Sequence, residues 1–235
     1  KGEIDVDLLL SHTFPLDKDS NGKWSSKIDA KDWWVSEKLD GVRAYWDHKK
    51  KTVYSRNGKP YSVPEWFKKN LPDEYLDGEL WHGRQEFQKT SGIVRHKTPN
   101  DEDWKEIKYK VFDLPELDKP FEERLEKLEA LVKDIPQVKF VEHWKCTGND
   151  QLFKDLEKYE NLGAEGLMLR KPESKYEGKR SKTLLKIKSF YDSEAEVLSH
   201  EEGKGRLKGL CGKMLVRSLS EIKNNRFTMP KGIEF

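Results

Sequence analysis

The sequence predicts a mixed α+β body that is followed by a small all-β module. Three observations support this fold class: strand-like alternation dominates the first half of the chain, two segments with helical periodicity follow, and short strand-like segments with glycine-rich turns occupy the end. The chain has 235 residues, a length that suits one large domain or two smaller ones. We therefore expect one domain over residues 1–190 and a second, all-β domain over residues 191–235.

The first half of the chain is predicted to supply paired strands. Residues 42–46 and 53–55 have strand-like composition, and the polar turn at residues 47–50 separates them. Residues 64–70 predict a short helix that stops before a proline, because proline cannot continue a helix. Residues 108–114 alternate as a strand does. We expect these strands to form antiparallel sheets.

Two helices are predicted in the second half. Apolar residues recur at helical spacing over residues 121–132, where Asp118 is the expected cap, and again over residues 152–159. Gly163 follows the second stripe and is expected to end that helix, because glycine readily adopts the left-handed conformation found after helix ends. We expect both helices to flank the sheets.

Strand-like patterns return after the helices, at residues 164–170 and 183–188. Beyond residue 190, short strands are separated by turns rich in glycine, a pattern typical of a small β-barrel. The glycines of these turns are Gly203, Gly205, Gly209 and Gly212.

Composition indicates a folded, polar protein and leaves the class of partner open. Hydrophobic residues make up 34% and charged residues 37%, yet the chain holds 8 Trp, 8 Tyr and 10 Phe, which is unlike a disordered chain. The net charge of +2 does not indicate a nucleic-acid binder, so any such site must come from local clusters of Lys and Arg. Cys146 and Cys211 form neither a disulfide framework nor a metal site. No apolar run reaches transmembrane length, so we expect no membrane partner.

The first segment that indicates chemistry is Glu37-Lys38-Leu39-Asp40-Gly41-Val42-Arg43. Lysine is a nucleophile only when it is deprotonated, and desolvation or a cationic neighbour favours that form. Arg43, on the returning strand, is a candidate neighbour of Lys38. Taken alone, the segment fits an ordinary surface hairpin equally well.

Further segments follow in a fixed order, at residues 34–46, 76–81, 91–95 and 111–115. They read Trp-Val-Ser-Glu-Lys-Leu-Asp-Gly-Val-Arg-Ala-Tyr-Trp, Leu-Asp-Gly-Glu-Leu-Trp, Ser-Gly-Ile-Val-Arg and Val-Phe-Asp-Leu-Pro. With this series the chain resembles the covalent nucleotidyltransferases, which comprise ATP-dependent DNA ligases, RNA ligases and mRNA capping enzymes. It is most similar to the minimal bacterial DNA ligases of the Lig E group, over nearly its whole length.

The resemblance implies a fold for each part of the chain. Residues 1–190 would form an adenylyltransferase (ATP-grasp-like) domain of antiparallel sheets with flanking helices. Residues 191–235 would form an OB-fold β-barrel that is incomplete at its C-terminal end, because the basic sixth motif of family ligases is not found before Phe235. That motif orients the leaving pyrophosphate, so self-adenylation is expected to suffer more than the later steps.

The resemblance also implies a role for each motif residue. Lys38 would attack the α-phosphate of ATP, release pyrophosphate and carry AMP as a phosphoramidate, with Mg²⁺ as the second cofactor. The remaining nucleotide contacts would be Glu37 at the adenine edge, Arg43 and Arg56 at sugar or phosphate, Glu79 at the ribose or the metal, Phe112 stacked on adenine, Glu165 at the metal, and Lys186 and Lys188 at phosphates.

Each of these residues also has a plain structural interpretation. Ser-Arg-Asn-Gly around Arg56 is a strong turn signal, and Phe112 could be an ordinary core residue. Glu165 lies on an apolar strand, where a buried carboxylate needs a partner and an exposed one does not. Alternation places Lys186 and Lys188 on one strand face, where a bound phosphate would relieve their repulsion, although solvated edge strands often carry such a pattern.

The implied partner is nicked double-stranded DNA, bound by a monomer without sequence preference and with strong salt dependence. Any one of the candidate contacts could equally be a solubilising surface charge. The candidates are Arg43, Arg170, Lys171, Lys175, Lys179, Arg180, Lys182, Lys204, Arg206 and Lys208.

Two other functions stay open from the sequence. An RNA ligase or capping nucleotidyltransferase shares the motifs in outline, although Lys-Leu-Asp-Gly-Val-Arg and Ser-Arg-Asn-Gly favour a DNA ligase. A non-catalytic DNA-end binding module would not need Lys38, Glu79 and Glu165. The Lig E resemblance further implies export to a periplasm, which no visible signal segment supports.

Overall fold

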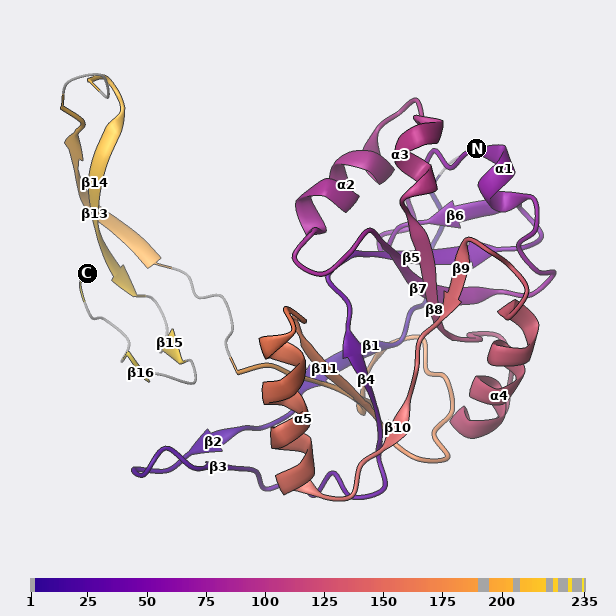
Figure 1. Cartoon of the computed structure of the whole chain (residues 1–235), viewed down its shortest axis with the longest axis horizontal. Coiled ribbons are helices and arrows are strands. Elements are labelled where there is room, and N and C mark those ends of the chain that lie inside the picture. Colours follow the sequence, from indigo (N-terminus) through magenta and orange to yellow (C-terminus); the bar gives the residue numbers. More distant parts are fainter. Residues whose placement is uncertain are drawn as a thin grey trace. The chain divides into compact units, whose positions relative to one another are not determined.

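The computed structural model describes residues 3–189, 195–204, 208–218, 222–223, 228–229 and 234 (Figure 1). The chain divides into two compact units, Lys1–Ile187 and Lys188–Phe235. The first unit holds two five-stranded sheets and the helices that flank them. Mixed α+β architecture with mainly antiparallel sheets confirms the predicted fold class for this part of the chain.

The first sheet has the strand order β1-β12-β11-β4-β10. Its pairs are antiparallel except for β1 and β12, which run parallel. Strand β4 pairs with β11 along its whole length and with β10 only at Trp34 and Val35, so its Lys38 end is paired through β11. The strands are β1 (Leu10–Thr13), β4 (Trp34–Lys38), β10 (Trp144–Lys145), β11 (Gly166–Arg170) and β12 (Arg180–Ile187).

The second sheet has the strand order β6-β5-β7-β8-β9. Only β8 and β9 run parallel. Alternation along β8 buries Tyr109 and Val111 completely and leaves Lys110 and Phe112 on the other face. The strands are β5 (Val42–Asp47), β6 (Thr52–Tyr54), β7 (Leu76–Trp81), β8 (Lys108–Asp113) and β9 (Val138–Phe140).

Helices cover the outer faces of the sheets in Figure 1. Helix α4 packs on β8 and β9, α5 packs on β11, and α2 packs on β7. All three predicted helices are present, and two further ones within residues 87–105 were not predicted. The helices are α1 (Glu65–Lys68), α2 (Phe87–Arg95), α3 (Asp101–Lys105), α4 (Phe121–Val132) and α5 (Asn149–Asn161). None of the described helices is long and apolar enough to cross a membrane.

The helix ends differ in part from prediction. Asp118 was expected to cap α4, but Pro120 takes the N-cap position and Asp118 instead pairs with Lys175 at 2.9 Å. Proline suits this position because its fixed backbone angle is compatible with a helix start. Gly163 follows α5 with a φ of +94°, as expected of a glycine after a helix end.

Two hydrophobic clusters support the two sheets. One lies around Trp46, Trp104 and Tyr109 on the second sheet, and the other joins Val35 and Leu167 of the first sheet to Leu156 of α5. Each sheet therefore buries one face against helices and keeps the other for the cleft described below.

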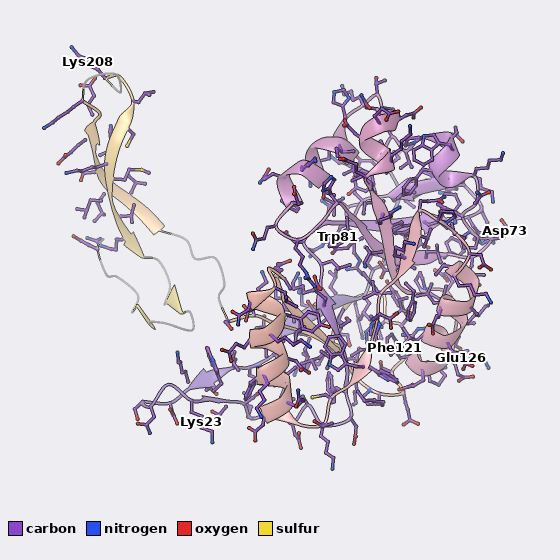
Figure 2. All side chains as sticks on the ribbon, in the orientation of Figure 1. Lys23, Asp73, Trp81, Phe121, Glu126 and Lys208 are labelled. Carbon is purple, nitrogen blue, oxygen red and sulfur yellow. The ribbon has the colours of Figure 1, made fainter. Side chains whose placement is uncertain are left out.

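Three further pairs of strands lie outside the two five-stranded sheets. β2 (Asp17–Lys18) and β3 (Trp24–Ser25) pair as a hairpin, and Figure 2 shows Lys23 near its tip. In the second unit, β13 (Ala195–Glu202) pairs with β14 (Cys211–Ser218), and β15 (Ile222–Lys223) pairs with β16 (Thr228–Met229). The described strands of this unit form no closed barrel, so the predicted OB-fold is not confirmed.

Candidate active site

A cleft of about 250 Å³ in the first unit is lined by residues of both sheets. The volume is close to the lower end of the range of small-molecule sites, roughly 300–1,000 Å³. The first sheet supplies most of the apolar lining, through Leu10, Met168 and Leu184. Both sheets supply charged side chains. Of the residues predicted to bind nucleotide, Glu37, Lys38, Arg43, Arg56, Glu79, Phe112 and Lys186 line the cleft.

Lys38 lies at the end of β4, beside the carboxylate of Glu165. The distance from Lys38 Nζ to Glu165 Oε1 is 3.3 Å, and the side chains are 22% and 26% exposed. The register of the sheet explains this proximity, because Lys38 pairs with Gly166, the residue that follows Glu165. The predicted nucleophile and one predicted metal ligand therefore lie side by side where the pairing of β4 and β11 ends.

Glu79 extends from β7 toward the same point. Its Oε2 atom accepts a hydrogen bond from the Gly41 backbone at 3.1 Å. Burial raises the pKa of Glu79 to about 7, although the charges of Lys38 and Arg43 act in the opposite direction. A Cβ at Gly41 would lie 2.4 Å from the Leu80 carbonyl oxygen, so only glycine fits between the Asp40 turn and Glu79.

Replacing Glu79 with neutral glutamine should show how much the buried negative charge lowers the free energy of unfolding. Because the folded pKa of about 7 exceeds the ordinary value of 4.5, the wild-type protein is stabilised below pH 4.5 and loses that stability as the pH rises through 7. We expect Glu79→Gln to raise the free energy of unfolding at pH 8 by about 1–3 kcal/mol and to change it little at pH 4.5.

Urea unfolding at the two pH values measures this difference. Glu126→Gln is the matched control, because Glu126 is exposed on α4 (Figure 2). An equal gain at both pH values, or a gain in the control, would contradict the expectation.

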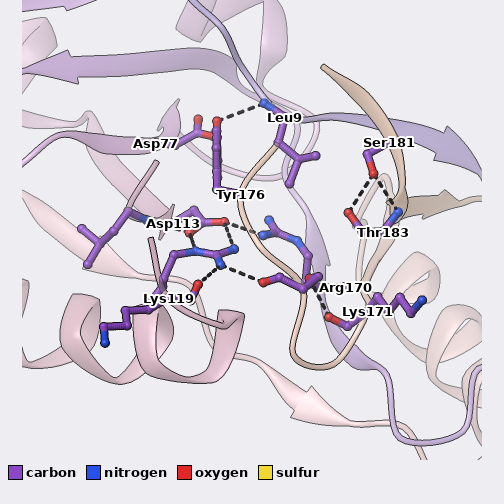
Figure 3. Close-up of polar contacts among 12 residues, drawn as sticks. Leu9, Asp77, Asp113, Lys119, Arg170, Lys171, Tyr176, Ser181 and Thr183 are labelled. Atoms are coloured by element: carbon purple, nitrogen blue, oxygen red, sulfur yellow. Dashed lines mark hydrogen bonds and ion pairs between the residues drawn. The ribbon is translucent and has the colours of Figure 1, made fainter. Parts of the chain in front are cut away.

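A buried hydrogen-bond network holds Arg43 in the cleft. Arg43 binds both carboxylate oxygens of Asp77, each at 2.7 Å, and donates to the Leu9 carbonyl at 2.9 Å. The Tyr176 hydroxyl donates to Asp77 at 2.7 Å and accepts from the Leu9 backbone, as Figure 3 shows. With its guanidinium fixed, Arg43 lies 5.2 Å from the ring of Phe112, so both predicted residues face the same space.

The two predicted phosphate-binding lysines belong to different units of the chain. Lys186 is on β12 and lines the cleft, while Leu185 and Ile187 are buried on the opposite face, as alternation predicted. Lys188 follows the end of β12 and belongs to the second unit, so its role stays a prediction.

The structure places Arg170 differently from the prediction that it contacts DNA. Arg170 is only 4% exposed, and its guanidinium pairs with the Asp113 carboxylate (Figure 3). Asp113 also binds Arg124 of α4, with distances of 2.7 and 3.2 Å. Arg170 therefore forms part of the cleft wall, held by a carboxylate 57 residues away in sequence, and its contact with DNA stays a prediction.

Apart from Arg43, the other predicted DNA contacts that the structure describes are surface residues. Arg180 is exposed, lines the cleft and donates to the Ser11 carbonyl. Figure 2 shows Lys208 at the tip of the hairpin formed by β13 and β14. Arg206 lies outside the described residues. The remaining exposed candidates are Lys171, Lys175, Lys179, Lys182 and Lys204.

Glu37 also differs from expectation. In the antiparallel pair of β4 and β11, Glu37 is opposite Leu167, whereas Ser36 is opposite Met168. Opposite residues share a face of the sheet, and Leu167 is fully buried in the cluster under α5. Glu37 thus lines the cleft with its side chain turned toward α5, where both of its carboxylate oxygens accept hydrogen bonds from Arg84. Its contact with the adenine edge stays a prediction.

Sequence reasoning missed several residues that line the cleft. Ser36, Met168 and Leu184 lie on the cleft face of the first sheet, and alternation with Lys38 was the available signal for Ser36. His143 lines the cleft through its position after β9, which no motif indicated. Burial lowers the pKa of His143 to about 4, and its Nδ1 atom lies 2.7 Å from the Val141 carbonyl oxygen, so the neutral ring is protonated at Nδ1.

A second, more open pocket of about 700 Å³ adjoins the cleft and shares Arg43, Arg56 and Glu79 with it. It lies over β5 and α2. Its basic lining residues beyond the shared ones are Lys59, Arg95 and Lys97, all exposed. The two pockets thus form one continuous surface with a positively charged outer part.

Comparison with known proteins agrees with this geometry. The family model for the ATP dependent DNA ligase domain matches residues 18–188. A DNA ligase from Haemophilus influenzae is 33% identical over 214 residues, which are 90% of this chain and 74% of that protein. A DNA ligase from Archaeoglobus fulgidus is 29% identical over 195 residues, 73% of this chain and 35% of that protein.

Solved structures give the same result. A structure from a study of DNA binding by Lig E DNA ligases is 34% identical, with a TM-score of 0.70 over 99% of this chain and 83% of that one. The Chlorella virus DNA ligase-adenylate, at 22% identity, shares the fold, with a TM-score of 0.61 over 96% of this chain and 84% of that one. This chain belongs to the ATP-dependent DNA ligase family.

Proposed function

We propose that this protein seals nicks with 5′-phosphate and 3′-OH ends in duplex DNA, and that Lys38 carries the AMP. The observation that supports the proposal is the position of the Lys38 amine. Its Nζ atom lies 3.3 Å from Glu165, at the edge of a cleft that residues of both sheets line, among them the predicted nucleotide contacts. Lys38 attacks the α-phosphate of ATP and pyrophosphate leaves. AMP then passes to the 5′-phosphate of the nick, and the 3′-OH displaces AMP to form the phosphodiester bond.

The walls of the cleft suit an adenine base. Phe112 lines it from the second sheet, and Met168 and Leu184 line it from the first. A planar base between an aromatic ring and aliphatic side chains buries apolar surface on both of its faces. The adenine would therefore lie deep in the cleft, with its phosphates toward Lys38.

The charged residues suit the phosphates and a Mg²⁺ ion. Arg43, Arg56 and Lys186 supply positive charge around the cleft, as transfer of a phosphoryl or nucleotidyl group requires. Glu79 and Glu165 supply carboxylate oxygens, which Mg²⁺ prefers together with phosphate oxygens and water. When bound there, the ion would neutralise charge on the triphosphate.

The basic part of the second pocket is suited to the DNA backbone. We expect Arg95→Ala combined with Lys97→Ala to weaken binding of a nicked duplex about tenfold or more at moderate salt. The slope of log K against log salt should fall by about two, because two phosphate contacts are lost. Fluorescence anisotropy at several salt concentrations measures both quantities.

Two controls accompany this double variant. Labelling of the protein by ATP without DNA should stay unchanged, because neither residue lines the inner cleft. Lys154→Ala with Lys158→Ala removes the same charge from the exposed side of α5 and should leave DNA affinity nearly unchanged. Equal losses from both pairs would show a general effect of charge and contradict a site at the second pocket.

The proposed reaction is tested directly with four nucleic-acid substrates. ATP and Mg²⁺ should support sealing of nicked DNA, and the same mixture with nicked RNA or diphosphate-ended RNA should give little product. A DNA nick already carrying AMP on its 5′-phosphate should also be sealed, without ATP. Failure on both nicked DNA and the adenylated nick would refute the proposal. A monomeric state and a periplasmic location stay predictions.

A further inference from the structure

Arg84 makes a two-pronged contact with the residue next to the nucleophile. It lies in the loop between β7 and α2, outside every motif of the sequence analysis. Its Nη2 atom donates to Glu37 Oε1 at 2.7 Å, and its Nε atom donates to Glu37 Oε2 at 3.1 Å. A planar guanidinium that binds both oxygens fixes the direction of the carboxylate as well as its distance.

The same guanidinium reaches the end of helix α5. Arg84 Nη1 donates to the carbonyl oxygen of Leu162, the C-cap residue, at 3.4 Å. Carbonyl groups at a helix C-terminus lack helical partners and attract positive charge. The neighbouring Gln85 side chain lies close to Gly163, since a Cβ there would meet Gln85 Nε2 at 3.2 Å. The loop therefore packs on the turn that leads into β11.

These contacts lie where the strand pairing of the first sheet ends. Lys38 and Gly166 form the last pair between β4 and β11, so Glu165 is one residue beyond the ladder. Strand register brings Lys38 and Glu165 to the same end of the sheet, but the backbone of Glu165, beyond the last pair, is not held by it. Arg84 contacts both strands' ends here: it binds Glu37 of β4 and the Leu162 carbonyl in the turn that leads into β11.

We propose that Arg84 is a positioning residue for the adenylation step. It joins the end of β4 and the turn before β11 to the loop after β7, the strand that carries Glu79. This inference rests on the proposed function, because it assumes that Lys38 is the nucleophile. The Arg84 and Glu37 side chains are 35% and 15% exposed, so solvent screens the pair only in part, and the tests below separate a positioning effect from a loss of stability.

Arg84→Ala tests the proposal by separating adenylation from the rest of the reaction. The rate of lysyl-AMP formation at saturating ATP should fall about tenfold or more, as expected when reacting groups are misplaced. The KM for ATP should change less than about threefold, since the variant leaves ground-state contacts in place. Sealing of a pre-adenylated nick should also change less than about threefold, because that step does not use the Lys38 amine.

Two further variants complete the design. Arg84→Lys keeps the charge but loses the planar fork, so it should restore only part of the rate. Lys127→Ala breaks an ion pair of similar exposure between Lys127 and Glu74, 3.3 Å apart and remote from Lys38 in the chain, and it should leave adenylation unchanged. If Arg84→Ala does not fold, Glu37→Gln takes its place and should lower the same rate constant.

The outcomes are distinct. Adenylation within about twofold of the wild type in a folded variant, or a change in KM alone, overturns the positioning role. An equal loss with the pre-adenylated nick also overturns it, because the defect would then be general. If the wild-type protein itself takes no label from ATP, this inference fails, whereas the proposed function fails only if the pre-adenylated nick also stays unsealed.

Discussion

Lys38→Ala is expected to abolish labelling of the protein by ATP that carries a radioactive α-phosphate. The Lys38 amine sits at the edge of the cleft, 3.3 Å from Glu165, and alanine leaves no atom there that can form the phosphoramidate. We expect labelling to fall below detection, a loss of at least about a thousandfold. Autoradiography of denatured protein measures it, and the label should be lost in acid.

Lys186→Ala is the matched control for this variant, because Lys186 supplies a second amine to the same cleft. It should slow labelling by weakening phosphate binding, yet leave the label on Lys38. Lys38→Ala should still seal a pre-adenylated nick, since that step needs no lysine nucleophile. Persistent labelling of Lys38→Ala, or a complete loss only in Lys186→Ala, would show that the nucleophile has been misidentified.

The order of motifs in the sequence predicted those site residues whose direction is set by the strand that carries them. Lys38, Glu79, Phe112 and Lys186 all line the cleft, because each sits on a strand whose alternation sets the face of its side chain. The same rule, applied to β4, would have separated Glu37 from Lys38. The motif groups Glu37 and Lys38 because they are adjacent in sequence, but adjacent residues on a strand point to opposite faces of the sheet.

The residues whose surroundings the sequence did not predict make contacts with residues far away in the chain. Arg170 belongs to a basic stretch that looks like surface, and only the fold brings it to Asp113. Arg124 lies among the charged residues of α4 and is nevertheless fully buried. Arg84 makes its key contact across 47 residues, from a loop without a motif. Spacing along the chain contains no information about such contacts, because they arise when separate elements pack.

The second large effect concerns Asp113, which balances two buried guanidiniums. Arg124 and Arg170 both bind it, and both lie over the ring of Phe121, at 5.4 and 4.5 Å. Burial alone would raise the pKa of Asp113, but the two arginines outweigh it and lower the pKa below its ordinary value. Arg124 also donates to the carbonyls of Lys119 and Ser174, so the network ties α4 to the segment after β11.

Asp113→Ala is therefore expected to lower the free energy of unfolding by about 3–5 kcal/mol at neutral pH, because it leaves two buried cations without a counter-charge. Urea unfolding measures the loss. Asp118→Ala, which breaks the exposed pair with Lys175, should cost less than about 1 kcal/mol. A loss as small as that of the control would contradict a structural role for the network.

The pH dependence of Asp113→Ala adds an independent check on the same network. Since the folded pKa of Asp113 is lower than the ordinary 3.8, its charge stabilises the protein above pH 3.8, and this contribution disappears as the pH falls through the folded pKa. The difference between wild type and variant should thus be constant near neutrality and shrink in acid. Because Phe112 precedes Asp113 on β8 and lines the cleft, the variant should also raise the KM for ATP, which links this buried charge balance to the nucleotide site.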